Sequence, residues 1–318
     1  MLVTATSPAG QAVPLGPIGS VDIRMDLDLP ADTFTGVFYP AAQPAEIAKI
    51  QVTSDDGARY WFQGPVDEQT FGAGPQGKRL VVKARSMAAK LLDNETAPAV
   101  YSDTWVTTVI RNHVAPYGIE GYEGNPFSVP GAFFVQRGET QWQAVTRFFD
   151  KAQLAPPRVT PWNTLYFSSY PIFSLPVVNL GDTAAGEPAC AAAHRTIRRK
   201  EVLEKIELVS QANVTGSILE NEQAANRDIQ RHRYLMYRNS PLELEMKSHY
   251  LIQAGNRASD ILSIRCLGEL PVTAGQAVRL KDPLLGTVSG YTVCRLHHRS
   301  DRAGRYTDLD CCRFDTSP

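Results

Sequence analysis

The strongest constraint on the fold is a strict alternation of residue types near the start of the chain. From Val21 to Leu29, every second residue is apolar, and the residues between them are Asp or Arg. A period of two predicts a β-strand with one buried and one solvated face, because successive side chains of a strand point to opposite sides. The chain therefore contains a sheet that packs on one side and meets water on the other.

More strands surround this one in the first 85 residues, after a Pro/Gly-rich segment at residues 1–20 that is expected to form an arm or an edge segment. The expected strands are Phe34–Tyr39, Ile50–Ser54, Arg59–Gln63 and Arg79–Ala84. Asp55-Asp56-Gly57 separates the second from the third of these, and Asp-Gly between two such runs predicts a hairpin. We expect residues 1–85 to form a small antiparallel barrel or sandwich.

The period changes after residue 85. Three runs with helical spacing each follow a residue that can cap a helix, namely Ser86, Ser102 and Thr140. Four aromatic residues of the second and third runs lie at core spacing, so we expect packing rather than ligand stacking: Trp105, Trp142, Phe148 and Phe149. Short strands are expected between these helices. Residues 86–190 are therefore expected to form an α+β domain.

Strands return in residues 191–318. Those expected are Ile261–Leu267, Ala277–Lys281, Val288–His297 and Tyr306–Phe314. Ser240 and Pro241 predict the start of a helix over 241–253, and Gly255 predicts its end. The order along the chain is therefore β, then α+β, then β, and the expected fold class is β-rich α+β.

Composition excludes several classes of protein. The 32 basic and 33 acidic residues give a formal charge of -1, which does not suit a cationic nucleic-acid binder. No apolar stretch is long enough for a membrane helix, and the N-terminus lacks the pattern of a signal peptide, so no membrane insertion is expected. Five cysteines without CxxC spacing predict free thiols in a reducing cytosol.

One glycine-rich motif and one group of metal-ligating residue types could be taken for ligand sites, but both are better explained by the structure of the chain. Gly72–Lys78 fits a phosphate-binding pattern, but a strand follows it where such a site needs a helix, so we expect a hairpin loop. Zinc-binding residue types gather near the C-terminus: Cys266, Cys294, His297, His298, Cys311 and Cys312. They fall on strands, where adjacent side chains diverge, so buried free cysteines are the favoured interpretation and zinc the alternative.

No local signature of an enzyme is present. The chain has neither a GxSxG elbow nor an HExxH motif. The Asp26/Asp28 and Asp308/Asp310 pairs fall on solvated strand faces. The basic cluster from Arg195 to Lys200 favours a surface patch or subunit contact over nucleic-acid recognition. We therefore expect no catalytic, cofactor-binding or metal residues, no cofactor and no enzymatic activity.

Several local sequences, taken in order, resemble the tail hub proteins of bacteriophages, the late-control-gene-D type that also forms the hub of phage-like injection machines. The residues that carry the resemblance are Leu29–Phe34, Lys83–Ser86, Leu91–Asp93, Ala115–Ile119, Gly138–Trp142, Gly275–Val278 and Gly290–Val293. The resemblance spans nearly all of residues 21–318. Ala84-Arg85 departs from the Gly-Arg that is usual before the first helix of the family. No lysozyme, peptidase or peptidoglycan-binding module is apparent, so a minimal hub is expected.

The resemblance implies a structural role in a phage or prophage tail, of the contractile type. It also implies two tube-like antiparallel β-barrel domains, one over residues 1–85 that part of 191–240 completes and one over 191–318, with an inserted α+β domain over 86–190. Three chains would form a pseudo-hexameric ring that joins a hexameric tail tube to a trimeric spike. The implied partners are two further copies, the tube protein, the spike protein and other baseplate proteins, with DNA only in passage through the lumen. The protein would be made in the bacterial host cytoplasm and become part of the virion tail.

Two other functions remain open from the residues alone. A β-rich carbohydrate-binding or receptor-binding tail component would need exposed aromatic side chains along one groove, such as Trp61, Trp105 or Trp162. A hydrolase with a dispersed site would need carboxylates that converge in a deep cleft. A structure separates these alternatives from the hub.

Overall fold

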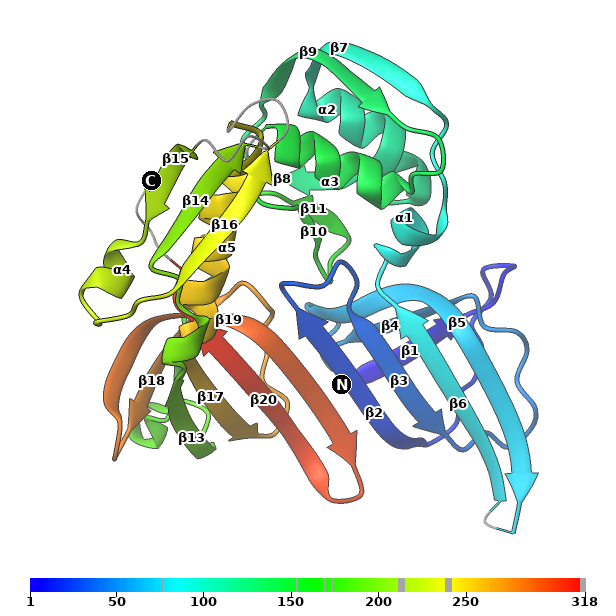
Figure 1. Ribbon diagram of the computed structural model, residues 1–318. Coiled ribbons are helices and arrows are strands. Elements are labelled where there is room, and N and C mark those ends of the chain that lie inside the picture. The colour runs from blue at the N-terminus through cyan, green and yellow to red at the C-terminus, as the bar shows by residue number, and fades with distance from the viewer. Residues whose placement is uncertain are drawn as a thin grey trace.

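The computed structural model is rich in β-structure, with 48% strand and 18% helix. It describes residues 1–75, 77–152, 154–168, 170–172, 174–210, 215–237 and 242–314. Figure 1 shows strands from both ends of the sequence side by side at the base, with an α+β unit and a smaller α/β unit above them. The expectation of a β-rich fold with several antiparallel sheets is confirmed.

One hydrogen-bonded path joins ten strands from the two ends of the chain. In spatial order these are β1 (Leu2–Thr6), β4 (Lys49–Thr53), β5 (Tyr60–Gly74), β6 (Gly77–Arg85), β3 (Thr33–Phe38), β2 (Ile18–Asp26), β19 (Gly286–Asp301), β20 (Gly304–Cys312), β17 (Asp260–Leu267) and β13 (Cys190–Ile197). β18 (Ala277–Asp282) branches from β19 and pairs with β12 (Val178–Leu180). The two halves meet at β2 and β19, which pair from Val21↔Ser300 to Asp26↔Arg295.

The described strands form no closed barrel. β1 and β13 end the path without pairing to each other, and a single apolar core runs through both halves of the sheet. That core contains Ile23 and Phe34 of the N-terminal half and Leu262 and Leu309 of the C-terminal half. Within the described residues, the strands from 205 to 237 pair with none of β1–β6. The domain boundaries expected at residues 85 and 190 stay predictions.

The alternation at residues 21–29 produces the expected two-faced strand, but the strand is shorter. Val21, Ile23 and Met25 are buried, and β2 ends at Asp26. Leu29 lies in the following loop and is 55% exposed. The Asp26 carboxylate accepts a hydrogen bond from the backbone N–H of Asp28, which turns the chain out of the strand.

The α+β unit has its own core. Its elements are α1 (Ala89–Asp93), β7 (Ala99–Trp105), α2 (Val106–Val109), the π-turn η1 (Ile110–Val114), the 3-10 turn η2 (Ala115–Tyr117), β8 (Gly121–Glu123), β9 (Ser128–Val135), α3 (Gln141–Lys151), β10 (Arg158–Val159) and β11 (Thr164–Tyr166). The cap at Thr140 is confirmed, because its side chain and that of Gln143 form a capping box. Trp142, Phe148 and Phe149 of α3 are buried as expected.

Two of the predicted helix caps in this unit are wrong. Ser102 lies in β7, where the chain pairs with β9, and the helix begins only at Val106. Trp105 therefore ends a strand and is 55% exposed instead of packing in the core. Ser86 does not cap α1, since its hydroxyl accepts a hydrogen bond from the backbone N–H of Asp32. Strand pairing and a tertiary contact override the local capping pattern at these two serines.

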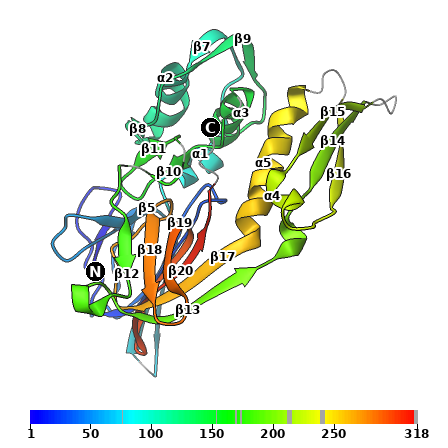
Figure 2. The ribbon, with the colours of Figure 1, turned by 90° about the vertical axis from the view of Figure 1, so that its left-hand side faces the viewer.

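The third unit is a small α/β layer inserted between β13 and β17. It contains η4 (Arg199–Glu201), β14 (Lys205–Ser210), β15 (Thr215–Glu220), α4 (Glu222–Ala225), β16 (His232–Tyr237) and α5 (Leu242–Ser259), and the turn η3 (Thr183–Ala185) precedes β13. Figure 2 shows α5 lying along the three-stranded sheet, where Ile252 joins a core with Ile206 and Leu208. Within the described residues, no helix is both long and apolar enough to cross a membrane.

α5 is longer than the predicted helix. Ser240 and Pro241 lie outside the described residues, and the helix continues through Gly255 to Ser259. A Cβ at Gly255 would lie 2.5 Å from the backbone carbonyl oxygen of Glu201. The glycine therefore permits a close helix–backbone contact and does not end the helix, so the prediction of a stop at residue 255 is wrong.

A buried ion pair joins the α+β unit to the long sheet. The Nη2 atom of Arg158 donates a hydrogen bond to Asp32 Oδ1 at 2.6 Å, and the Nη1 atom of Arg158 donates one to the backbone carbonyl of Asp26 at 2.7 Å. The two side chains are 4% and 3% exposed. Burial raises the pKa of the Asp32 carboxyl, and the Arg158 guanidinium opposes that rise. The pair therefore fixes β10 against the loop that connects β2 and β3.

Removing the cation of this pair should destabilise the protein strongly. In Arg158→Met the Asp32 carboxylate stays buried without a partner, and breaking such a pair costs about 3–5 kcal/mol. Urea unfolding followed by tryptophan fluorescence measures the loss. Arg265→Met, which removes an exposed cation, should have a far smaller effect, and Asp32→Asn combined with Arg158→Met should recover part of the loss. Equal effects of the two single variants would contradict the assigned role.

A buried histidine links the two halves of the sheet. The His298 ring of β19 stacks on Trp61 of β5, with ring centroids 4.9 Å apart, and its Nδ1 lies 3.0 Å from the Thr307 hydroxyl. Desolvation lowers the pKa of His298 to about 4. The imidazole is therefore neutral in the folded protein at neutral pH.

Acid should destabilise the fold through His298. Because the pKa of His298 in the folded protein lies below the ordinary histidine value of 6.5, the unfolded chain binds the proton first, and stability falls as pH drops from about 6.5 to about 4. The shift corresponds to a loss of about 3 kcal/mol. Melting temperatures of wild type and His298→Gln across this range measure the loss. The variant should have a shallower slope, whereas His194→Gln, which changes an exposed ring, should match wild type.

Candidate functional site

The candidate functional surface is the solvated face of the long sheet. Eight neighbouring strands form one continuous sheet there, in the order β5, β6, β3, β2, β19, β20, β17 and β13. Of β5, only residues 66–74 belong to this sheet. All seven neighbouring pairs are antiparallel. One face covers the apolar core, so the alternating residues are left on the other face. We call this eight-stranded sheet the wall.

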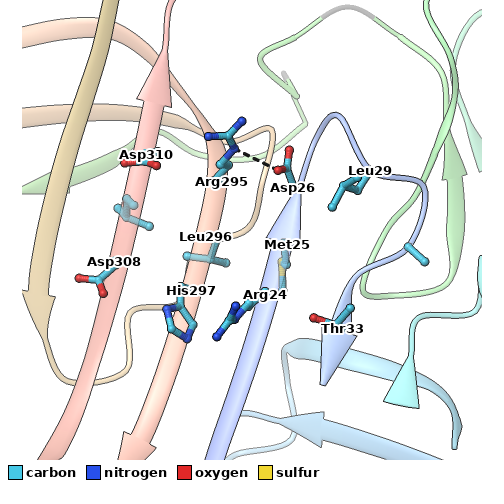
Figure 3. Close-up of a pocket in the computed structure, with 12 residues that line it drawn as sticks. Arg24, Met25, Asp26, Leu29, Thr33, Arg295, Leu296, His297, Asp308 and Asp310 are labelled. Carbon is cyan, nitrogen blue, oxygen red and sulfur yellow. Dashed lines mark hydrogen bonds and ion pairs between the residues drawn. The ribbon is translucent and has the colours of Figure 1, made fainter. Parts of the chain in front are cut away.

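Opposite charges face each other across the central strands of the wall. Arg295 of β19 stands between Asp26 of β2 and Asp310 of β20, and its Nε lies 3.0 Å from Asp26 Oδ2. In the next row, His297 stands between Arg24 and Asp308. Figure 3 shows these side chains projecting from the three neighbouring strands. Directly opposed residues on one face lie close enough to interact, so the sheet register brings the charges together.

Further ion pairs extend these rows to both sides. We call the whole set the ionic ladder; its members on β2, β19, β20 and β17 are Asp22, Arg24, Asp26, Arg295, His297, Arg299, Asp308, Asp310 and Arg265. Arg265 holds Asp308 through two hydrogen bonds of 2.6 and 2.9 Å, which raise the pKa of Arg265. His297 Nε2 lies 2.7 Å from Asp22 Oδ2. The ladder therefore matches nearly every cation with a carboxylate.

The N-terminal side of the wall repeats this arrangement on β5 and β6. Lys83 Nζ lies 2.9 Å from Glu68, and the hydrogen bond lowers the pKa of that carboxyl. Arg85 binds Asp67 through two hydrogen bonds of 2.9 Å and also pairs with Asp93 of α1, which raises the pKa of the guanidinium. Paired charges therefore occur on both halves of the wall.

The centre of the wall is hollowed. A recess of about 450 Å³ lies over β2, β19 and β20, beneath the loop that carries Leu29 (Figure 3). Its lining combines Arg24, Asp26, Arg295 and Asp308 with the strand backbones. Within the described residues, no group of three or more His, Cys, Asp or Glu side chains could hold a metal ion. The recess is therefore a charged, solvated depression of the sheet.

Within the described residues, no strand pairs with either lateral edge of the wall, although the segment before β4 hydrogen-bonds to the Gln69 side chain of β5. On β13, the Arg198 backbone N–H donates to the Ser259 carbonyl on the β17 side, so the N–H groups of Ala193 and Arg195 point away from β17. On residues 67–74 of β5, the described strands provide a partner only on the β6 side. Unpaired strand edges are ready templates for another strand.

A second groove lies where the three units meet. It has a volume of about 800 Å³ and is lined by apolar and aromatic side chains, among them Trp142, Tyr250 and Phe314. The Arg257 guanidinium lies over the rings of both Tyr250 and Phe314, 5.6 and 5.1 Å from their centroids. The groove therefore marks the joint between the α+β unit, α5 and the wall.

The structure separates the residues that the sequence presented as possible ligands. Gly72–Lys78 connects β5 to β6 as the expected hairpin, with Gly74 opposite Gly77 and with Gln76 outside the described residues. His297 lies on the solvated face and His298 in the core, as their adjacency on a strand predicts. Trp61 is buried against His298, so it cannot line an exposed glycan groove.

The sequence interpretation missed the ladder. Asp26, Asp308 and Asp310 were expected only to be solvated, and their arginine partners were not singled out. The available signal was the run of alternating charges at residues 22–26 together with those at 295–299 and 306–310. The basic cluster disperses in the fold, since Arg195 pairs with Asp260 and Arg199 donates to the backbone carbonyls of Arg227 and Asp228.

No family model matches this chain, and no curated protein matches it by sequence. Solved structures match almost its whole length. A tail protein from Neisseria meningitidis MC58 superposes with a TM-score of 0.76 at 17% identity, covering 98% of this chain and 96% of the other. The 43 kDa tail protein of prophage MuSo2 from Shewanella oneidensis gives 0.75 at 15% identity, with 98% of each chain covered.

This chain has the fold of phage tail proteins. A third match with this tail-protein fold is an Escherichia coli component of the type VI secretion system, described as structurally similar to the T4 bacteriophage tail proteins gp27 and gp5. It has a TM-score of 0.63 at 10% identity and covers 99% of this chain and 78% of the other. The resemblance to tail hub-like proteins is thereby confirmed at the level of the fold.

Reversing one charge of the ladder should weaken the tail-protein fold in a salt-dependent way. Arg295→Glu places a carboxylate between Asp26 and Asp310, and like charges directly opposed on a sheet destabilise it by roughly 1 kcal/mol at low salt. Thermal melts at 20 mM and 500 mM NaCl measure the loss, which should shrink at high salt because ions screen the repulsion. Arg302→Glu, in the exposed β19–β20 turn, is the control. A salt-independent loss would contradict the ladder.

Proposed function

We propose that this chain is the structural hub subunit of a phage or prophage tail. Three copies form a pseudo-hexameric ring that joins a hexameric tail tube to a trimeric spike and leaves a conduit for DNA. The neighbours with the same fold include phage and prophage tail proteins, which supports a place in the tail or baseplate. The role is mechanical and involves no catalysis.

The observation that carries the proposal is the open wall, whose two edge strands run in opposite directions and have no further strand partner among the described residues. Its eight strands alternate in direction, so β5 at one edge runs opposite to β13 at the other. The β13 edge of one copy can therefore pair antiparallel with the β5 edge of the next copy. Such a contact is heterologous, and rotation about a threefold axis closes it into a ring.

The two edges also suit each other chemically. The β5 edge carries Asp67 and Glu68 and then the small residues Gly72 and Ala73, whereas the β13 edge begins with small residues and continues to His194 and Arg195. Small side chains on both edges allow close backbone approach, so the two strands can come within hydrogen-bonding distance.

Each half of the wall is proposed to be one tube-like barrel unit. β1, β4 and the first part of β5 accompany the N-terminal four strands, and β18 and β12 accompany the C-terminal four. Two such units in each of three chains give six similar elements around the axis. A threefold ring built in this way can contact a sixfold tube on one side and a threefold spike on the other.

The ionic ladder is proposed to line the conduit. Its arginines are paired with carboxylates, so the surface offers DNA no continuous row of free positive charge. A strongly basic lumen would bind the phosphates and retard passage, because phosphate neutralisation dominates nucleic-acid affinity. The paired charges keep the wall hydrated without holding the polyanion.

Blocking the β13 edge should abolish the ring and leave the fold intact. Ala193→Pro removes an N–H that points away from β17, so it deletes a donor to the next copy but none within the chain. We expect wild type to form threefold rings in negative stain and trimers in native mass spectrometry, and the variant to remain monomeric with a similar melting temperature. Ala193→Ser, which keeps the N–H, should form rings.

The decisive comparison includes a trimeric spike protein, since a partner can drive ring closure. The hub proposal would be contradicted if the wild-type chain remained monomeric at high concentration, both alone and with the spike protein. Rings of wild type that persist in Ala193→Pro would keep the hub and exclude β13 as its closing edge.

A further inference from the structure

Two cysteines face each other across the β13–β17 strand pair. Cys190 and Cys266 are directly opposed in the register, and their sulfur atoms lie 3.7 Å apart. Opposed residues of an antiparallel pair have Cα atoms about 4.5–5.5 Å apart, which falls within the range that a disulfide bridges. A small side-chain rotation therefore suffices to bring the sulfurs into bonding distance.

The two thiols differ in access. Cys190 is half-buried at the first residue of the edge strand, whereas Cys266 is fully buried in the core. The hydrogen bond with Cys266 lowers the pKa of the Cys190 thiol, and the same bond raises that of Cys266. A reagent from solvent therefore meets Cys190 first, and Cys266 is placed to react second.

Among the remaining cysteines, a hydrogen bond with Cys294 raises the pKa of the Cys312 thiol, but the two are not opposed in the register, because Cys312 lies opposite Thr292. Cys311 and Cys312 are buried, and the Cys294 thiol donates to the backbone carbonyl of Asp310 at 3.1 Å. Burial raises the pKa of Cys311, so its reactive thiolate is suppressed.

We propose that Cys190 and Cys266 are an oxidisable dithiol that reacts with a small disulfide, of the oxidised glutathione class, and closes into a cross-strand disulfide. The site does not depend on the proposed function. It would remain reduced in a cytosol and close once the protein reaches an oxidising medium.

The reaction balances in two steps. The Cys190 thiolate attacks one sulfur of oxidised glutathione, a mixed disulfide forms, and one glutathione thiolate leaves. The Cys266 sulfur then gives up its proton and attacks the Cys190 sulfur, which expels the second glutathione thiolate. The two protein thiols are oxidised, one glutathione disulfide is reduced, and the two protons end on the released glutathione molecules.

The cross-link would close a loop around the whole third unit. Cys190 and Cys266 are 76 positions apart, and the chain between them contains β14–β16 and α5. A disulfide across a loop of this length restricts the unfolded chain and pins the edge strand β13 to β17. The free edge of the wall would thus become more rigid without any new surface contact.

The test treats the folded full-length protein with oxidised glutathione at pH 8 and maps its peptides without reduction. We expect a product two hydrogens lighter than the reduced protein, in which the Cys190 peptide is joined to the Cys266 peptide. Its melting temperature should rise by roughly 5 °C or more, and dithiothreitol should reverse both changes. Cys311→Ala, which removes a buried neighbouring thiol, should still form the link, whereas Cys190→Ser should not.

Three outcomes would overturn the proposal. Cys190 could retain glutathione as a stable mixed disulfide, it could link to a cysteine other than Cys266, or both thiols could remain reduced while the protein is folded. If oxidised glutathione modified Cys266 of the Cys190→Ser variant as fast as it modifies Cys190 of the wild type, the proposed order of attack would also be contradicted.

Discussion

The pairing of β2 with β19 is the contact on which the rest of the structure depends. It joins strands 269 positions apart in sequence, as at Asp26 and Arg295, and turns two sets of strands into one sheet. Bringing such distant segments together costs chain entropy, which burial must offset. Ile23 and Met25 on β2 and Leu296 on β19 are buried in the same core, so the pairing completes that core as well as the backbone hydrogen bonds of both strands.

Both other units are attached to this sheet at the ends of individual strands, the α+β unit at β2 and the α/β unit at β13 and β17. The α+β unit is fixed by Arg158, which reaches Asp32 and the end of β2 within one buried contact. The α/β unit is inserted between β13 and β17, which pair along their whole length. Arg195 and Tyr291 both bond Asp260 where β17 begins, so the attachment lies close to a charged network at the free edge. The geometry of the wall therefore determines where both units stand.

The sequence predicts those features that depend on nearest neighbours along the chain. The alternation at Val21–Met25 identifies the buried face, and Thr140 identifies the start of α3, because each signal is local. It does not predict that β2 lies beside β19, since either strand could pair with several others of similar pattern. The predictions at Ser102 and Gly255 are wrong because contacts between distant parts of the chain decide the structure there. The backbone around Ser102 pairs with β9, and the Glu201 carbonyl lies so close to α5 that only glycine fits at residue 255. The ladder escaped prediction because its pairs exist only in the register of the folded sheet.

That register also explains why the charges alternate both along and across the strands. Exposed ion pairs contribute little stability, because water and salt screen them, so the ladder is not what holds the sheet together. A slip of one residue between β2 and β19 would move Ile23 and Met25 from the core to the solvated face. The same slip would bury Arg24 without a partner and separate Arg295 from Asp26. Core and ladder thus favour one register for the same reason, and a surface of matched charges follows from the alternation that builds the core.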